Sequence, residues 1–420
     1  SGDHRVLHSF PTRRSSDLIL RLLQRAGWVT AGNIVGQAAV LLATMWLARM
    51  YTPAEFGLLA IVLVVSNISV ALAGLRFDIA IPAASDEDAK GLVVMAMLSV
   101  LTTALLATGA LFAADRFGWL DLPLIETHAL LFFLTILTSG TFQTLTACLV
   151  RQERFRTVGV LRGAQGLSFV AVASAPFIGL LWAQALSLAW GLAVLPATLA
   201  AARGMTPAHL VQIIRRQWKL PLFSLPGAAL DVIGYSMVIW VLVGVYGPAE
   251  AGTYSQMQRL VGGPLMLISI SLGQVMLRQT VDHLGDPAAM RTLLFRVFAG
   301  LAGMTLLAVI AVAAVGAPVL RLIMGDQWVI APMMAVLVTV AVGARACVSP
   351  LSSVLISMRR FDIGLIWQAL YFCSAALLFP WMASHLSFQG FIAFYAAHEA
   401  MLYTVYLALI WRTVSRSEGL

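Results

Sequence analysis

The residues of this sequence best suited to chemistry are ionisable side chains inside long apolar stretches. Arg162, Arg259 and Arg345 lie within such stretches, and so do the acids Asp231 and Glu399. A charged side chain at the centre of a bilayer costs about 2.5–3.5 kcal/mol on insertion scales, so each one requires an explanation. Three arginines against two acids leave an excess of positive charge, and the guanidinium fork suits phosphate oxygens. The pattern predicts a cationic cavity for an anionic ligand.

Structural roles compete with this interpretation, and their weight differs between residues. Arg259 and Arg345 lie too deep to reach the membrane surface easily, so a functional role is favoured for both. Arg162 lies near one end of its stretch, where its guanidinium could extend to the cytoplasmic face. Arg76 and Asp78 end the second apolar stretch, and they are either cavity residues or a plain interfacial pair.

Polar residues of the first apolar stretch share one side of a helix. Asn33 and Gln37 are four residues apart, so they project from the same face. Gly32 and Gly36 form a pair of small residues that permits close approach of a second helix. The sequence leaves two roles open for this face of the helix: close packing against a second helix, and the wall of a polar cavity. The adjacent His398-Glu399 pair points to two faces of its helix, which favours structural packing.

Motifs of known catalytic chemistry are absent from the sequence. It contains no nucleotide-phosphate loop, no HExxH and no Ser/His/Asp constellation. Cys148, Cys347 and Cys373 all fall in apolar segments, without the spacing of a disulfide framework or a metal site. We therefore expect a protein that is not an enzyme, with no metal and no bound cofactor.

The composition indicates the kind of protein whose helices must position these residues. Of 420 residues, 60% are hydrophobic and only 11% are charged, and the mean hydropathy is +0.89. A soluble protein would carry about a quarter charged residues, so this is a polytopic membrane protein. The net charge is +8, carried by arginines that cluster between the apolar stretches. That distribution reports membrane topology and excludes nucleic acid as a partner.

Twelve stretches approach the ~20 residues that a membrane-spanning helix needs. We expect each of them to form a helix. They cover roughly 26–48, 56–75, 91–112, 129–150, 157–180, 182–202, 222–246, 253–277, 291–316, 331–350, 363–383 and 388–411. The tenth stretch could run on to Ser357. With the N-terminus inside, the basic residues in and near loops fall overwhelmingly on the inner side; only Arg49, Arg116 and Arg321 fall outside. Both termini are therefore expected in the cytoplasm.

A repeated heptapeptide divides the chain into two similar halves. Residues 51–57 read YTPAEFG and residues 246–252 read YGPAEAG, each between two apolar stretches. Each copy is expected to form a tight junction between helices at a membrane surface, with Tyr at the interface and Pro in the first helical turn. Arg154-Phe155 and Arg360-Phe361 repeat in the same way. Such internal repeats are typical of transporters.

The halves define the expected domains. Residues 18–202 form an N-terminal bundle of six helices, 203–221 a basic cytoplasmic linker, 222–412 a C-terminal bundle of six, and 413–420 a cytoplasmic tail. Residues 1–17 do not fit this pattern. They resemble a translated adapter or fusion scar, so we expect a non-native or disordered segment.

A series of short motifs runs along the chain. It begins in the first hairpin with LARMYTPAEFG at 47–57 and continues in LRFDIAIP at 75–82. It extends through LFSLP at 222–226, the second heptapeptide, Gln258-Arg259-Leu260 and SPLS at 349–352. The series resembles the bacterial polysaccharide flippases, the O-antigen and exopolysaccharide exporters of the multidrug/oligosaccharidyl-lipid/polysaccharide superfamily. These motifs cover about residues 20–412 in the family's order.

Membership of that family implies twelve helices in two bundles around a central cavity. It implies an undecaprenyl diphosphate-linked oligosaccharide as substrate, moved to the periplasmic leaflet of the inner membrane by alternating access. The cavity residues that the resemblance implies are Arg76, Asp78, Arg259 and Arg345. Coupling to a proton gradient, a sodium gradient or the membrane potential stays open, as does association with a polysaccharide polymerase or a chain-length regulator.

Two other classes remain as alternatives. An ion-coupled drug or metabolite exporter of the same superfamily would bind cations and favour acidic spans, whereas arginines outnumber acids here. A membrane polysaccharide polymerase or ligase would carry a large periplasmic loop, and none of the loops is expected to exceed about twenty residues.

Overall fold

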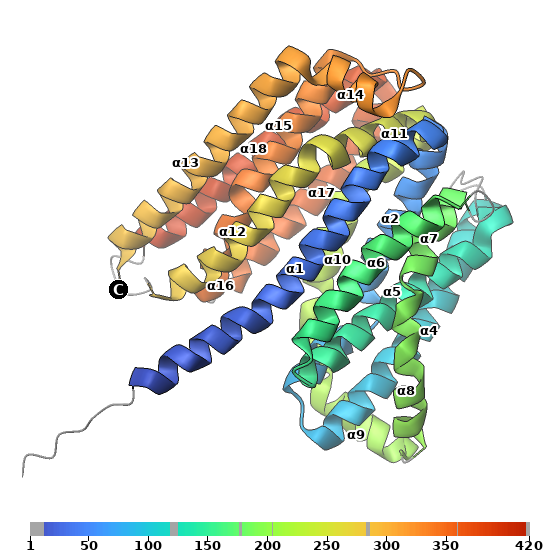
Figure 1. The fold of residues 1–420 in the computed structure, drawn as a ribbon, viewed down its shortest axis with the longest axis vertical. Coiled ribbons are helices and arrows are strands. Elements are labelled where there is room, and N and C mark those ends of the chain that lie inside the picture. Colours follow the sequence, from blue (N-terminus) through green and yellow to red (C-terminus); the bar gives the residue numbers. More distant parts are fainter. Residues whose placement is uncertain are drawn as a thin grey trace, which may run out of the picture.

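The computed structural model describes residues 12–117, 125–175, 179–203, 205–282, 286–358 and 360–416. Over these ranges the chain is helical and contains no strand, as predicted. Most of the segment 1–17 lies outside the described residues. Figure 1 shows two groups of helices, an N-terminal lobe and a C-terminal lobe, which meet at one end and diverge toward the other.

The N-terminal lobe consists of the helices before residue 203. They are α1 (Thr12–Met50), α2 (Pro53–Leu72), α3 (Phe77–Ala80), η1 (Ile81–Ala83), α4 (Asp86–Arg116), α5 (Ile125–Arg151), α6 (Phe155–Ala173), α7 (Gly179–Ser187), η2 (Ala189–Val194) and α8 (Leu195–Ala202). The short amphipathic helix α9 (Pro207–Gln217) then leads to the second lobe.

In its described residues the C-terminal lobe is interrupted by three π-helical turns. Its helices are α10 (Lys219–Val241), the π-turn η3 (Leu242–Tyr246), α11 (Pro248–Met257), the π-turn η4 (Gln258–Gly262), α12 (Gly263–Asp282), α13 (Pro287–Ala311), the π-turn η5 (Val312–Gly316), α14 (Ala317–Met324), α15 (Pro332–Val348), η6 (Ser349–Ser352), α16 (Ser353–Ser357), α17 (Phe361–His385) and α18 (Phe388–Arg416). Such turns are rare and occur frequently at functional sites.

Ten segments of the described chain are long and apolar enough to cross a membrane. Each overlaps one of the predicted spans, and the tenth predicted span does continue to Ser357. The other two predicted spans, 157–180 and 253–277, coincide largely with α6 and with α11, η4 and α12. Those segments are helical, but their length and hydropathy do not identify them as spans. The count of twelve therefore stays a prediction.

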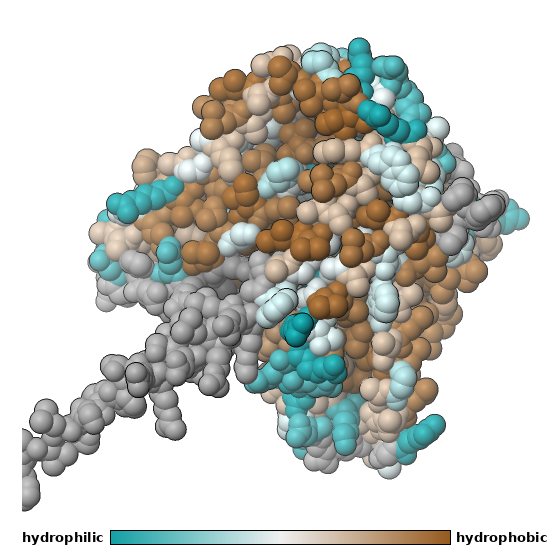
Figure 2. Space-filling view, viewed as in Figure 1, coloured by the Kyte–Doolittle hydropathy of each residue, from teal (hydrophilic) through white to brown (hydrophobic). Residues whose placement is uncertain are grey.

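The outer surface is apolar over the middle of the molecule. Figure 2 shows apolar side chains across both lobes, with polar side chains gathered over the ends of the helices. Large apolar residues are exposed there, among them Leu106 at 68%, Leu307 at 69% and Leu377 at 72%. A water-soluble protein would not expose apolar surface on this scale, so the belt marks the surface that faces lipid.

Glycines set the contact between α1 and α6. A Cβ on Gly32 would lie 2.0 Å from the carbonyl oxygen of Gly159, and one on Gly166 would lie 2.5 Å from the Cα of Gly36. Neither position can carry a side chain without separating the helices. The predicted close approach at Gly32 and Gly36 is therefore present.

Candidate functional site

The two heptapeptides pack directly against each other where the lobes meet. A Cβ on Gly57 would lie 1.8 Å from the carbonyl oxygen of Pro248, and a Cβ on Gly252 would lie 1.8 Å from that of Pro53. Each copy thus places its glycine on the proline of the other copy. The contact joins α2 to α11 and closes this end of the molecule, which we call the closed end (Figure 1).

The tyrosine of each heptapeptide binds the end of the corresponding helix of its own lobe. Tyr51 donates its hydroxyl hydrogen bond to the carbonyl oxygen of Ala173, at the end of α6, at 2.8 Å. Tyr246 lies 2.9 Å from the carbonyl oxygen of Leu386 and 3.1 Å from that of Ala383, at the end of α17. The two halves therefore repeat the same local structure at the closed end.

A further set of contacts between the lobes lies beside the heptapeptides. Arg49 donates to the carbonyl oxygens of Leu322 at 2.6 Å and Ile323 at 3.1 Å, at the end of α14. Trp328 is buried, and its Nε1 donates to the carbonyl oxygen of Ala48 at 2.8 Å. These bonds attach α1 to the C-terminal lobe and reinforce the closed end.

Arg76 and Asp78 lie at the opposite end of α2. Arg76 has a left-handed backbone (φ 64°), and its Nε donates to Ser224 of α10 at 3.2 Å, a contact between the lobes. Asp78 is buried and hydrogen-bonds with Gln143. Burial raises the pKa of the Asp78 carboxyl, while the charge of Arg76 and the Gln143 bond oppose the shift. The pair is therefore more than an exposed ion pair at the interface.

Arg162 and Asn33 come together between α6 and α1. The Nη1 of Arg162 donates to the Oδ1 of Asn33 at 3.4 Å, while its Nε is buried without a partner among the described residues. Asn33 and Gln37 are both exposed. Both side chains are therefore accessible beside the glycine contact, and Asn33 is also bonded to Arg162.

Arg345 lies in the middle of the C-terminal lobe, against an aromatic ring. Its Cζ is 3.8 Å from the ring centroid of Tyr235, close enough for a strong cation–π interaction. Gln258 donates to the Tyr235 hydroxyl at 2.6 Å, which holds the ring in place. Asp231 is exposed one turn before Tyr235 and interacts electrostatically with Arg345. No ion pair joins Arg345 to a described acid, so its fork stays available to a ligand.

Further aromatic residues surround this arginine, and the sequence analysis did not identify them. Trp367 stacks on Tyr406 at 4.2 Å between ring centroids and lies 5.5 Å from Tyr371. Tyr403 and Tyr371 are close enough to interact electrostatically with Arg345. The signal in the sequence was their helical spacing: 367 and 371 on one helix, 403 and 406 on the next.

A buried polar network continues from these tyrosines into α18. Tyr371 donates to the Glu399 carboxylate at 2.6 Å, and Ser374 lies 3.0 Å from Nε2 of His398. His398 and Glu399 are 3% and 1% exposed. Their adjacent side chains bind different groups on α17, so they join α17 and α18 as the packing interpretation expected.

Arg259 occupies the π-turn η4 between α11 and α12. No described acid forms an ion pair with it, Asp231 included. Gly262 of the same turn packs against Val342 of α15, one turn before Arg345. The two arginines therefore lie on adjoining elements of one lobe, although the structure does not place them in contact.

The eight predicted site residues thus fall into three groups rather than one. Asp231, Arg259 and Arg345 belong to the C-terminal lobe, Arg162, Asn33 and Gln37 to the α1–α6 contact, and Arg76 and Asp78 to the end opposite the heptapeptides. Their common role in binding remains a prediction.

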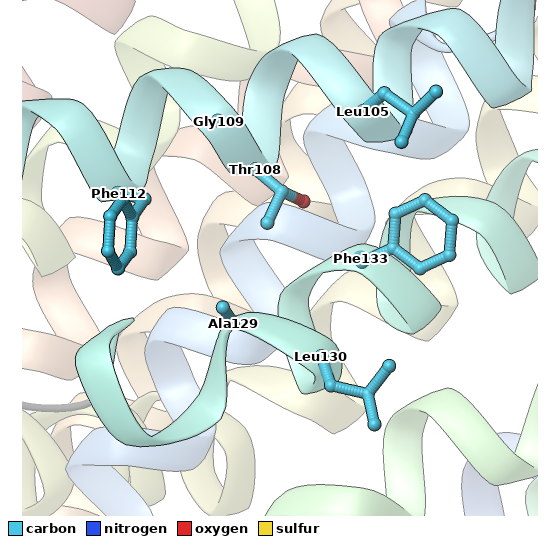
Figure 3. Close-up of a pocket in the computed structure, with 7 residues that line it drawn as sticks. All are labelled: Leu105, Thr108, Gly109, Phe112, Ala129, Leu130 and Phe133. Atoms are coloured by element: carbon cyan, nitrogen blue, oxygen red, sulfur yellow. The ribbon is translucent and has the colours of Figure 1, made fainter.

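An apolar groove of about 460 Å³ lies apart from these groups, between α4 and α5. Figure 3 shows Leu105, Thr108 and Phe112 on one side and Leu130 and Phe133 on the other. Leu105 and Leu130 are exposed on the surface. The groove belongs to the apolar belt and carries no charged group, so it is not the predicted cationic cavity.

Comparison with solved structures identifies the class of fold. The lipid II flippase MurJ in its inward closed conformation aligns with a TM-score of 0.70 at 11% identity, over 94% of this chain and 90% of MurJ. A multidrug resistance MATE family transporter of the MOP superfamily aligns at 0.63 and 11% identity, over 93% and 96%. The Vibrio cholerae MATE transporter VcmN aligns at 0.58 and 15% identity, over 96% and 98%. The chain has the fold of MOP-superfamily transporters.

The sequence itself belongs to a narrower group. The family model described as "Polysaccharide biosynthesis protein" matches residues 46–332, and the chain is a member of that family. No curated protein sequence matches it. The family and the all-helical membrane fold that the motifs predicted are confirmed.

Proposed function

We propose that this protein moves an undecaprenyl diphosphate-linked oligosaccharide from the cytoplasmic to the periplasmic leaflet during synthesis of a cell-surface polysaccharide. The observation that carries the proposal is the pair Arg345 and Arg259, which lie on adjoining elements of one apolar lobe without an acidic partner within ion-pairing distance among the described residues. A diphosphate suits two guanidinium forks, because each phosphate can accept two parallel hydrogen bonds. The family match to polysaccharide biosynthesis supports this class of substrate.

The aromatic residues beside Arg345 suit the saccharide. Tyr235 is half-buried and carries a hydroxyl group, and Gln258, which bonds that hydroxyl, and Asp231, one turn before Tyr235, add further hydrogen-bonding groups. The polyprenyl tail can stay in lipid while the polar head passes between the lobes. An inside-negative potential would assist the outward movement of the diphosphate by about 2.3 kcal/mol per charge per 100 mV for a full crossing.

The difference between the two ends of the molecule supports a mechanism of alternating access. The heptapeptides, Arg49 and Trp328 join the lobes at the closed end, whereas at the other end the lobes diverge apart from the hydrogen bond between Arg76 and Ser224 (Figure 1). In the proposed cycle the closed end faces the periplasm, both termini lie in the cytoplasm of a bacterial cell, and the state described is open to the inside. A polymerase and a chain-length regulator would take over the product. Proton, sodium or voltage coupling would supply the energy.

The proposal is tested by flipping in vesicles. The purified protein would be reconstituted with a fluorescent undecaprenyl diphosphate-linked saccharide, and movement scored by loss of protection from an impermeant reductant. Arg345→Ala and Arg259→Ala should lose flipping, and the lysine variants should retain part of it, because charge survives without the fork. Arg321→Ala, an exposed arginine of α14, is the matched control. Full flipping by both alanine variants would refute the proposed site.

A further inference from the structure

The helix α9 has an apolar arc that the protein covers only in part. α9 connects the two lobes and lies across the end of α4 and α8 (Figure 1). Helical spacing places its apolar residues on one side. They are Leu210, Val211, Ile213 and Ile214, followed by Trp218 just after the helix.

One edge of the arc packs on the N-terminal lobe. Ile213 is 1% exposed, and its Cδ1 occupies the place where a Cβ on Gly91 of α4 would stand. The rest of the protein does not cover the other edge: Val211 is 48% exposed, Ile214 38% and Trp218 47%. A helix of the aqueous surface would turn polar residues outward at these positions.

The depth of α9 determines what meets that uncovered edge. Gly91 lies three residues, or about 5 Å, inside the apolar helical segment Asp88–Arg116, and it is the first residue of the predicted span 91–112. That is the depth at which in-plane amphipathic helices lie, between headgroups and acyl chains. Tryptophan is also enriched at this level.

The two arginines of α9 have different surroundings. Arg216 forms an ion pair with Asp88 of α4 at 3.4 Å, which attaches the helix to the lobe. Arg215 is exposed beside the uncovered apolar edge, and no described acid pairs with it. A cation at headgroup depth next to an apolar edge matches the phosphate of an anionic lipid.

We propose that α9 is an in-plane membrane helix that binds anionic phospholipid in the leaflet at this end of the molecule. Val211, Ile214 and Trp218 enter the acyl boundary, and Arg215 holds the lipid phosphate. Because α9 connects the lobes, the bound lipid fixes the linker at the membrane surface. This interaction is independent of the substrate proposed above.

Amide hydrogen exchange of the full-length protein in nanodiscs tests this inference. The peptide covering residues 207–218 would be compared in phosphatidylcholine alone and in a mixture with phosphatidylglycerol. We expect about fivefold slower exchange in the mixture, the factor that one basic residue gains near an anionic surface. Arg215→Gln should abolish the difference. Arg412→Gln, which removes an exposed arginine at the same end of the molecule, should keep it.

Two further arms separate lipid from other occupants. Soluble glycerol 3-phosphate should not slow exchange in phosphatidylcholine discs, because the apolar edge needs acyl chains. Ile214→Gln should speed exchange in both lipids. Equal exchange of the wild type in the two lipids, an unchanged difference in Arg215→Gln, or slowing by glycerol 3-phosphate alone would each overturn the proposal.

Discussion

At the scale of single residues, the C-terminal lobe contains an arginine and a carboxylate that do not touch. Tyr371 is common to both: it donates to Glu399 at 2.6 Å and interacts electrostatically with Arg345. Tyr371 therefore lies between the two groups, and no ion pair with Glu399 occupies the arginine. The guanidinium fork of Arg345 is therefore left without an acidic partner among the described residues.

Removing the Tyr371 hydroxyl should therefore destabilise the lobe. Tyr371→Phe leaves a buried carboxylate without its donor, and an unsatisfied buried acceptor costs about 1–3 kcal/mol. The measurement is the unfolding free energy of the protein in detergent. In a Glu399→Gln background the same change should cost less, because the remaining acceptor is neutral. An equal cost in both backgrounds would show that the bond contributes no charge-dependent stability.

Asp78 should give the protein a pH-dependent stability. Burial raises the pKa of its carboxyl, so the folded state holds the proton more tightly than the unfolded state. Its contribution is fully present below the ordinary aspartate pKa of about 3.9 and is lost as pH rises through the raised folded value. Unfolding temperatures measured across acidic pH should thus fall less steeply with rising pH in Asp78→Asn. Asp326→Asn, an exposed aspartate near the closed end, should keep the wild-type slope.

At the scale of elements, the sequence predicted the two junctions but not their contact. A repeat shows that two segments have equivalent structures, and the tyrosine contacts of α6 and α17 agree with that. It does not show that Gly57 and Gly252 each meet the other copy's proline. That contact is a property of the lobe arrangement. The π-turn at Arg259 was also unpredictable, because no residue type marks a π-turn as Pro or Gly marks a break.

The reciprocal glycines allow a test of the closed end. Gly57→Ala or Gly252→Ala places a methyl group 1.8 Å from a carbonyl oxygen, so α2 and α11 must separate. Spin labels at Ala54 and Ala249 should then report a longer distance and a larger open population. Gly109→Ala is the matched control, because its Cβ would meet nothing within 4 Å. Unchanged distances in all three variants would contradict the role of the heptapeptides in closure.

At the scale of the whole molecule, hydropathy located ten spans well because lipid-facing surface demands apolar residues. It could not place the site residues relative to one another. Arg345 and Tyr235 are 110 positions apart in sequence (345 − 235), and only the packing of α10 on α17 and of α15 on α18 brings their side chains together. Distances between helices depend on side-chain packing, which hydropathy does not encode.

The orientation of the molecule in the membrane is the last property that a direct measurement should decide. Basic residues in and near the loops fall mostly on the side of the termini, which predicts a cytoplasmic location for that side. α1 begins and α18 ends at the end opposite the heptapeptides (Figure 1), so one orientation determines both ends. Single cysteines at Ala54 and Ser384, at the closed end, should react with an impermeant thiol reagent applied to intact cells. Cysteines at Asp86 and Arg360, exposed at the other end, should react only after permeabilisation. The reverse pattern would place the closed end in the cytoplasm, and the cavity would then receive its substrate from outside, which excludes export by the proposed cycle.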